Sequence, residues 1–187
     1  AQTDVTCNGG NNGSASVAVT GGTGAYTYSW APSGGTAATA TGLSAGTYTV
    51  TITDANLCTK TESFTITEPD AITAAISKTD VSCNGGANGS AAVAASGGTG
   101  SYTYAWAPSG GTAAAASGLS AGTYTVTITD ANGCSAAETV TIDEPALLAA
   151  SIAKTDVLCS QADNGTATVT ASGGTGPYTY SWSPSGG

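Results

Sequence analysis

Hydrophobic and polar residues alternate along several short segments of the chain. In GTYTVTITD, residues 46–54, the side chains of Tyr48, Val50 and Ile52 fall on one face of an extended backbone, and threonines fall on the other. This period of two predicts half-buried β-strands with one apolar face. The same pattern recurs in AYTYSW, GSASVAVT, SFTITEP and AITAAIS. No segment has the spacing and capping residues typical of a helix.

Clusters of turn-forming residues separate the predicted strands. They read NGGNNG, GGTG, PSGG, LSAG and DAN, and are rich in the Gly, Asn, Asp and Pro that favour tight turns. Six or seven short strands at intervals of about ten residues predict an all-β sandwich.

The whole pattern then repeats with a step of 76 residues. Residues 3–69 and 79–145 are identical at 51 of 67 positions. The chain is therefore predicted to hold one sandwich repeat over residues 1–69, with an incomplete N-terminal strand, a second over 70–145, and a truncated third over 146–187. The step separates Cys7, Cys83 and Cys159, Trp30, Trp106 and Trp182, and also Cys58 and Cys134.

One phrase points to the type of sandwich. GLSAGTYTVTITD, residues 42–54, resembles the tyrosine-corner segment of immunoglobulin-like sandwiches, which include fibronectin type III and polycystic-kidney-disease-type repeats. The resemblance implies that Tyr48, and Tyr124 in the second repeat, bond back to the preceding bend. The short connection through Pro69, which has no Gly-Ser spacer, predicts repeats arranged end to end. Trp30, Trp106 and Trp182 are expected on the inward strand faces.

The small core of each repeat predicts disulfide cross-links. Five cysteines leave two connectivities open. In the first, Cys7 bonds Cys58 and Cys83 bonds Cys134, and Cys159 is unpaired in this chain. In the second, Cys58 bonds Cys83 and Cys134 bonds Cys159. We favour the first.

Composition narrows the classes of function. The net charge of −9, with three Lys and no Arg, argues against a nucleic-acid partner, and no apolar stretch is long enough for direct membrane insertion. The chain also has no His. Without His and Arg, the common general base and the common oxyanion clamp are missing, so we expect no enzyme and no catalytic residues.

Acidic residues in turns are candidates for a calcium site, and no other cofactor is expected. Calcium prefers oxygen ligands from loops, but no dense acidic motif is present. The competing interpretation is that aspartates in these turns bond their own backbone. The recurring carboxylates are Asp4, Asp54, Glu68, Asp80, Asp130, Glu144 and Asp156.

Taken together, the motifs resemble a known family. CNGGNNGSASVAVTGGTGAYTYSW, GLSAGTYTVTITDANLC and the following TITEP are similar to the SprB-type repeats of very large surface adhesins of gliding and other Bacteroidota. Leu57 replaces the usual Gly, and CSQADNG replaces CNGGxNG at Cys159. The resemblance implies type IX secretion, an extracellular location at the outer cell surface, and a filament that serves adhesion or gliding motility.

These observations favour a structural stalk module of a filamentous adhesin. Its partners would be neighbouring repeats of the same chain, with surface polysaccharide or other filament chains as further ones. The alternative is a carbohydrate- or calcium-binding repeat that acts through avidity. The aromatic stripe of Tyr26, Tyr28 and Trp30 would suit stacking on sugars, although an inward strand face explains it better.

Overall fold

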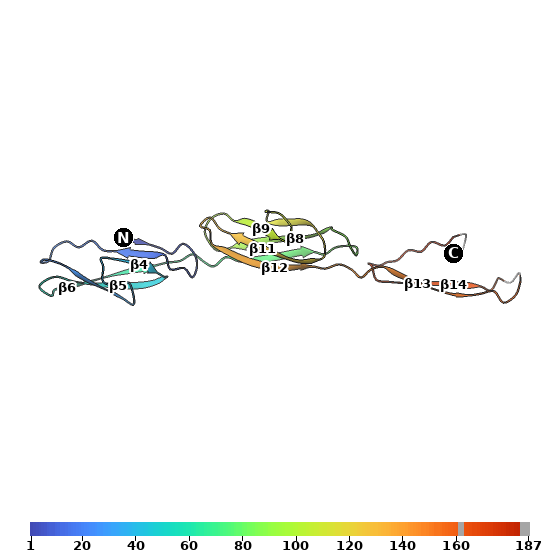
Figure 1. Cartoon of the computed structure of the whole chain (residues 1–187), viewed down its shortest axis with the longest axis horizontal. Helices are drawn as coiled ribbons and strands as arrows, with labels where there is room; N and C mark the ends of the chain where they lie inside the picture. The colour runs from blue at the N-terminus through green and yellow to red at the C-terminus, as the bar shows by residue number, and fades with distance from the viewer. Residues whose placement is uncertain (161–162, 184–187) are drawn as a thin grey trace. The chain divides into compact units, whose positions relative to one another are not determined.

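A computed structural model describes residues 1–160 and 163–183 of the chain. These residues form short β-strands joined by turns, with antiparallel pairing and no helix (Figure 1). The prediction of an all-β fold is confirmed. Nothing in the described part of the chain is a helix able to cross a membrane. Gln161 and Ala162, which belong to the departure after Cys159, lie outside the described residues.

The first 66 residues contain two three-stranded sheets. The pairing registers place Trp30 opposite Val50, and Tyr48 opposite Phe64. One sheet has the order β1-β2-β4 and consists of β1 (Gln2–Thr3), β2 (Gly13–Ser16) and β4 (Thr39–Leu43). The other has the order β3-β5-β6 and consists of β3 (Thr27–Ala31), β5 (Gly46–Thr53) and β6 (Thr59–Ile66).

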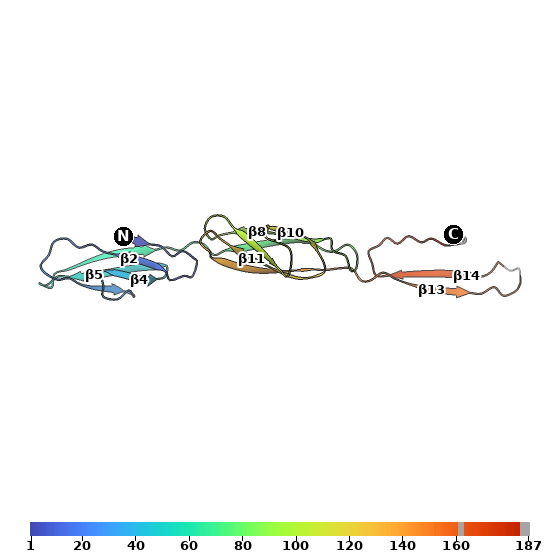
Figure 2. The same cartoon turned by 45° about the horizontal axis from the view of Figure 1, so that its top comes forward.

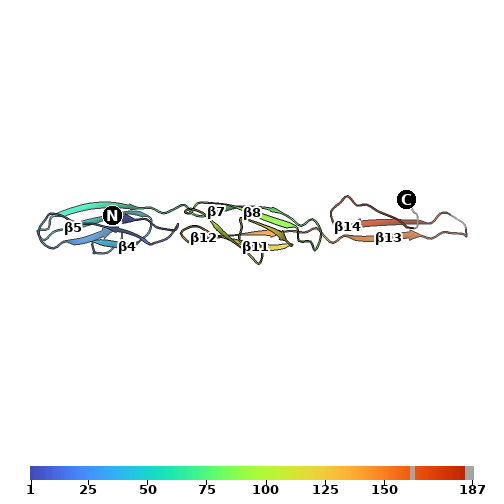
Figure 3. The same cartoon turned by 90° about the horizontal axis from the view of Figure 1, so that it is seen from above.

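The same strand order recurs further along the chain. One sheet, in the order β10-β8-β7, contains β7 (Thr73–Thr79), β8 (Gly89–Ser96) and β10 (Ala115–Leu119). The next, in the order β12-β11-β9, contains β9 (Thr103–Ala107), β11 (Gly122–Thr129) and β12 (Ser135–Ile142). Beyond them, β13 (Ala149–Thr155) and β14 (Thr166–Ser172) pair as an antiparallel hairpin (Figures 2 and 3).

Contacts between residues divide the chain into two compact units. The first unit comprises Ala1–Ala75, Ala95–Tyr104 and Thr127–Ala137. The second comprises Ile76–Ala94, Ala105–Val126 and Glu138–Gly187. The first unit therefore combines the first sequence repeat with the opening residues of the second repeat and with the two loops that follow β8 and β11.

The core of the first unit draws on both of its complete sheets. In β5, Tyr48, Val50 and Ile52 are buried, while the threonines between them are half-exposed, as the alternation in the sequence predicts. Because strands of both sheets contribute buried side chains, the cluster holds the two sheets together. Its buried members are Val5, Ala15, Trp30, Ala40, Leu43, Tyr48, Val50, Ile52 and Ile66.

The equivalent positions of the second repeat are also buried. Val126 and Ile128 are fully inaccessible, and Trp106 is 7% exposed. Both buried tryptophans have a partner for the indole N–H, because Trp30 donates to the Ala37 carbonyl and Trp106 to the Ala113 carbonyl, each at 2.9 Å. A buried indole needs such an acceptor. The tryptophans at these positions thus belong to the core.

The last described segment is less well covered. Leu147, Leu148 and Ile152 are 60–71% exposed, and Tyr180 is 52% exposed. Trp182 is half-buried. Within residues 1–160 and 163–183, this two-stranded hairpin has no opposing sheet against which to bury its apolar face.

Candidate functional site: the disulfide of the first unit

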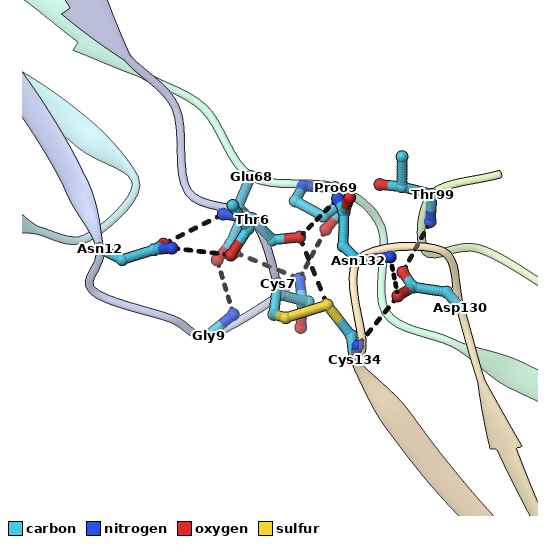
Figure 4. Close-up of a disulfide and its surroundings, with 11 residues drawn as sticks. Thr6, Cys7, Gly9, Asn12, Glu68, Pro69, Thr99, Asp130, Asn132 and Cys134 are labelled. Carbon is cyan, nitrogen blue, oxygen red and sulfur yellow. Dashed lines mark hydrogen bonds between the residues drawn. A yellow bond between two sulfur atoms is a disulfide. The ribbon is translucent and has the colours of Figure 1, made fainter.

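A disulfide joins Cys7 to Cys134 (Figure 4). The two residues are 127 positions apart in sequence, and their Cα atoms lie 5.6 Å apart. Both belong to the first compact unit, but Cys7 comes from the first sequence repeat and Cys134 from the second. The bond therefore ties one repeat covalently to the next.

The predicted pairs Cys7–Cys58 and Cys83–Cys134 are not those of the structure. Cys58, Cys83 and Cys159 are free and exposed. Cys7 lies near the end of β6, where the neighbouring Gly9 contacts Glu68, whereas Cys58 lies just before the start of β6. At about 3.3 Å per residue, this strand holds the two apart by roughly 25 Å, while bonded cysteines need Cα atoms within about 7 Å. The second connectivity, through Cys58–Cys83, is not present either.

The turn that carries Cys7 is held by the carboxylate of Glu68. The Gly9 amide donates to Glu68 Oε2 at 2.6 Å, and the Asn8 side chain donates to Glu68 Oε1 at 3.2 Å (Figure 4). Asn8 also donates to the Pro69 carbonyl at 3.1 Å, and the Gly10 amide closes the turn onto the Cys7 carbonyl. Hydrogen bonds to an ionised carboxylate are the stronger kind. The end of β6 thus fixes the position of the first cysteine.

The turn that carries Cys134 is organised by Asp130, whose side chain is buried. Asp130 Oδ1 accepts the amides of Asn132 and Cys134, both at 2.9 Å. Asp130 Oδ2 accepts the amide of Thr99 at 2.8 Å. This is a turn in which the aspartate bonds the backbone that follows it.

The same hydrogen bonds decide the charge of Asp130. Burial raises the pKa of its carboxyl, but the backbone amides, that of Thr99 first and that of Cys134 next, lower it by more. The pKa of Asp130 therefore lies below its ordinary value, and the side chain is an anion at neutral pH.

Polar contacts accompany the disulfide. The side-chain amide of Asn132 donates to the Thr6 carbonyl at 3.3 Å, and Cys134 Sγ lies 3.3 Å from the same oxygen (Figure 4). The Thr6 amide in turn donates a hydrogen bond to Asn12 Oδ1 at 3.1 Å. The covalent bond is thus placed within a set of oriented backbone groups.

The turn around Cys83 repeats the one around Cys7. The Gly85 amide donates to Glu144 Oε2 at 2.6 Å, and the Asn84 side chain donates to the Pro145 carbonyl at 3.1 Å. The Gly86 amide closes onto the Cys83 carbonyl at 3.0 Å. These distances match those of the first turn, although Cys83 is free.

The turn around Cys58 repeats the one around Cys134. Asp54 Oδ1 accepts the amides of Asn56 and Cys58 at 2.9 Å, and Asp54 Oδ2 accepts the amide of Thr23 at 3.0 Å. The Cys58 amide is the main cause of an Asp54 pKa below its ordinary value. Each of these two kinds of cysteine turn is therefore seen both bonded and free.

The remaining calcium candidates also contact the backbone or a lysine. Asp4 accepts the Thr67 amide, and Asp80 accepts the Asp143 amide, each at 2.9 Å. Asp156 lies 2.7 Å from Lys154. Within residues 1–160 and 163–183, no three His, Cys, Asp or Glu residues gather where they could hold a metal. The structure therefore does not bring the seven carboxylates into one site.

Lys78 lies between two carboxylates of the second unit, the calcium candidate Asp80 and Asp143, which was not a candidate. Its Nζ lies 2.6 Å from Asp143 and 2.9 Å from Asp80. The hydrogen bond to Asp143, followed by that to Asp80, raises the pKa of Lys78. The pKa of Asp80 is lowered by the Asp143 amide and by Lys78. This ion pair lies beside the turn that carries Cys83, because Asp143 directly precedes Glu144, which contacts Gly85 in that turn.

The two tyrosines named from the sequence occupy equivalent places. The Tyr48 hydroxyl donates to the Ser44 carbonyl at 3.2 Å, and the Tyr124 hydroxyl donates to the Ser120 carbonyl at 3.1 Å. Each tyrosine is 6% exposed. The hydroxyls thus tie the start of β5 and of β11 to the bend before each strand.

Sequence reasoning missed the Cys7–Cys134 bond, but a signal for it was present. The predicted strand that ends at Ile66 separates Cys58 from Glu68, and Cys7 had to be placed at one of its two ends. Pairing the first cysteine of one repeat with the second cysteine of the next requires that two consecutive repeats be considered together.

These features define a class of protein: an all-β tandem-repeat chain with a covalent bond from one repeat to the next. The family model described as SprB repeat matches residues 1–35, 75–111 and 151–187, which together exceed half of the chain. The chain belongs to the SprB repeat family, whose repeats occur in cell-surface proteins. None of the curated proteins compared with the chain matches it.

Proposed function

We propose that this chain is a load-bearing stalk segment of a long, filamentous cell-surface adhesin. The observation that carries the proposal is the Cys7–Cys134 disulfide, which joins consecutive repeats. Repeats that acted only as independent binding modules would have no need of a covalent bond between them. Membership of the SprB repeat family supports a surface adhesin.

The disulfide changes how tension travels along the chain. Force entering at the N-terminal end passes from Cys7 directly to Cys134, so the segment between the two cysteines does not carry it. Over a separation of 127 residues, at roughly 3.5 Å per residue, the bond withholds about 440 Å of extension. A stalk with this bond keeps its length even when the folds inside the loop open.

We further propose that each complete repeat is an immunoglobulin-like sandwich and that successive repeats follow end to end. Two three-stranded sheets with a shared core, and the Tyr48 and Tyr124 hydroxyl bonds, support the sandwich. The short connection through Pro69 supports the serial arrangement, because proline restricts both itself and the residue before it. Type IX export, an extracellular position and a role in gliding rest on the family resemblance.

Pulling a single chain by its two ends tests the proposal. Full extension of the oxidised chain is expected to fall short of that of the reduced chain by roughly 440 Å. Cys7→Ser should behave as the reduced chain from the start, and Cys58→Ser, the matched control, should behave as the unsubstituted chain. Equal extension with and without reductant would contradict a load-bearing bond.

Direct binding measurements distinguish the stalk function from the alternative, a carbohydrate- or calcium-binding repeat. A stalk segment is expected to show no affinity for surface polysaccharide by calorimetry, and its melting temperature should not respond to calcium or to a chelator. Saturable binding in either titration would favour the alternative.

One cavity of the first unit bears on that choice. It has a volume of about 530 Å³ and is lined in part by Val17, Tyr26 and Asp54. At the equivalent place in the second repeat, Ile72 lies against Gly98, beside Asp130. In the second repeat a side chain of the same chain therefore lies at the equivalent place, and the cavity gives no specific support to a sugar site.

A further inference from the structure

We propose that the first cysteine of every repeat bonds the second cysteine of the following repeat, so that Cys83 and Cys58 are cross-linking sites for neighbouring repeats. Cys83 would bond the equivalent of Cys134 in a following repeat. Cys58 would bond the equivalent of Cys7 in a preceding one. We call this series of disulfides between successive repeats the disulfide ladder. Its biological role rests on the proposed stalk function, but the bonds themselves can be tested apart from it.

The turns around the free Cys83 and Cys58 are each one half of a disulfide site, and we call them half-sites. Their geometry carries the inference. Cys83 sits in a turn fixed by Glu144 with the same amide contact, at 2.6 Å, that Glu68 makes beside the bonded Cys7. Cys58 sits in a turn fixed by an aspartate with the same 2.9 Å amide contact as the bonded Cys134. Each half-site is therefore already shaped as it is when bonded.

Exposure shows what the free half-sites lack. Cys7 and Cys134, which are bonded, are half-buried, whereas Cys58 and Cys83 are exposed. Asn132 contacts the backbone next to the bonded Cys7, and Asn56 holds the same place in the turn of the free Cys58. In the proposed arrangement, another repeat of the same sequence type supplies this cover.

The spacing of the cysteines gives the ladder a property that single bonds lack. Each bond would close a loop with a separation of 127 residues, but the repeat advances by only 76. Successive loops therefore overlap, and each peptide bond in the interior of such an array lies inside at least one loop. A single backbone break would leave the filament covalently continuous.

The chemistry of each bond is an ordinary thiol–disulfide exchange. The two thiols lose two protons and two electrons, and a disulfide oxidant such as glutathione disulfide accepts them and becomes two thiols. A thiolate of one repeat attacks the oxidant, and the thiolate of the neighbouring repeat then displaces the leaving thiol from the mixed disulfide.

The three lysines of the chain allow a direct test by trypsin. With Lys60, Lys78 and Lys154 as the cleavage sites, cysteines fall in the peptides 1–60, 79–154 and 155–187. The chain is extended after Gly187 with its own residues 112–145, which continue the register of the third repeat and add an equivalent of Cys134 but no lysine. Both forms are refolded in a glutathione redox buffer, alkylated, denatured and cleaved without reductant.

In the unextended chain, peptides 1–60 and 79–154 are expected to remain joined, and the last peptide to separate. In the extended chain, all three cysteine-containing peptides should form one species that reductant separates. Cys83→Ser should release only the last peptide, and Cys159→Ser, the matched control, should not release it. Cys58→Ser should leave the linkage of both forms unchanged.

A last peptide that separates from the extended chain, or that stays joined after Cys83→Ser, would overturn the proposal. The link between peptides 1–60 and 79–154 reports in the same sample that the first bond has formed. In the extended chain, Cys7→Ser should leave the last two cysteine-containing peptides linked. This result would show that each disulfide forms independently of the others. The pulling experiment tests whether the chain bears load, and the peptide linkages test whether the disulfides form. A failure of the stalk function would leave these linkages intact, so the two failures can be told apart.

Discussion

Leu57 and Gly133 hold the same position in two equivalent turns, and both have a left-handed backbone, with φ of 66° and 83°. Leu57 is the only non-glycine with positive φ among residues 1–160 and 163–183. A side chain in this conformation costs about 1–2 kcal/mol. The leucine side chain is 81% exposed, so packing does little to offset that cost.

Leu57→Gly is therefore expected to raise the free energy of unfolding by about 1 kcal/mol. Gly133→Ala should lower it by a similar amount in the second repeat. Denaturant unfolding followed by circular dichroism measures both. Ala55→Gly, in the same turn but without positive φ, is the control and should not stabilise. A Leu57→Gly variant no more stable than the unsubstituted chain would show that the turn tolerates leucine without strain.

Tyr124→Phe is expected to lower the free energy of unfolding by about 1 kcal/mol or more. The change removes the hydroxyl that donates to the Ser120 carbonyl and leaves that acceptor without its partner. Tyr48→Phe should have a similar effect through Ser44. Thermal melting detects the loss, and Tyr180→Phe, at an exposed position, serves as the control. An unchanged melting temperature for both buried variants would contradict a stabilising role.

Stability should fall in acid. The pKa values of Asp54, Asp80 and Asp130 are lowered in the folded chain from an ordinary value of 3.8. A depressed carboxyl pKa contributes stability above the unfolded value, and this contribution is lost as the pH falls through the folded value. Melting temperatures should therefore decline below about pH 4. The decline should be shallower in Asp130→Asn, and Glu138→Gln, on the exposed face of β12, is the control.

For Lys78 the change of stability with pH has the opposite sign, and it occurs at high pH. Its pKa is raised above 10.5, so its contribution is present below that value and is lost as the pH rises through the folded pKa. Lys78→Gln should remove this alkaline dependence and weaken the Asp80 share of the acid dependence, while the shares of Asp54 and Asp130 stay in place. A chain whose stability did not change between pH 6 and pH 3 would contradict the acid prediction.

Reduction of the disulfide should destabilise the first unit. A closed loop with a separation of 127 residues stabilises by about 5 kcal/mol at most in the chain-entropy model. Cys7→Ser and reductant are each expected to lower the melting temperature, and reductant should then have no further effect on the variant. Cys58→Ser, which removes a free thiol, should melt as the unsubstituted chain. Equal melting of oxidised and reduced chains would contradict the bond.

The sequence by itself determined the strands, the buried faces and the family. Alternation along GTYTVTITD places Tyr48, Val50 and Ile52 in the core because side chains of a strand point to opposite faces in turn. Such information is local, and each residue carries it within its own segment. The turn aspartates are similar, since Asp54 bonds amides two and four residues further on.

The tertiary structure alone decided which cysteines meet and which aspartate is buried. Cys7 and Cys58 share a repeat but lie beyond opposite ends of β6, whereas Cys7 and Cys134 meet across a separation of 127 residues. Likewise, Asp130 is buried and its equivalent Asp54 is only half-buried, because Ile72 lies against Gly98 beside Asp130. Equal spacing in sequence leaves such pairings undetermined, because a bond forms only where the folded strands bring two atoms within reach.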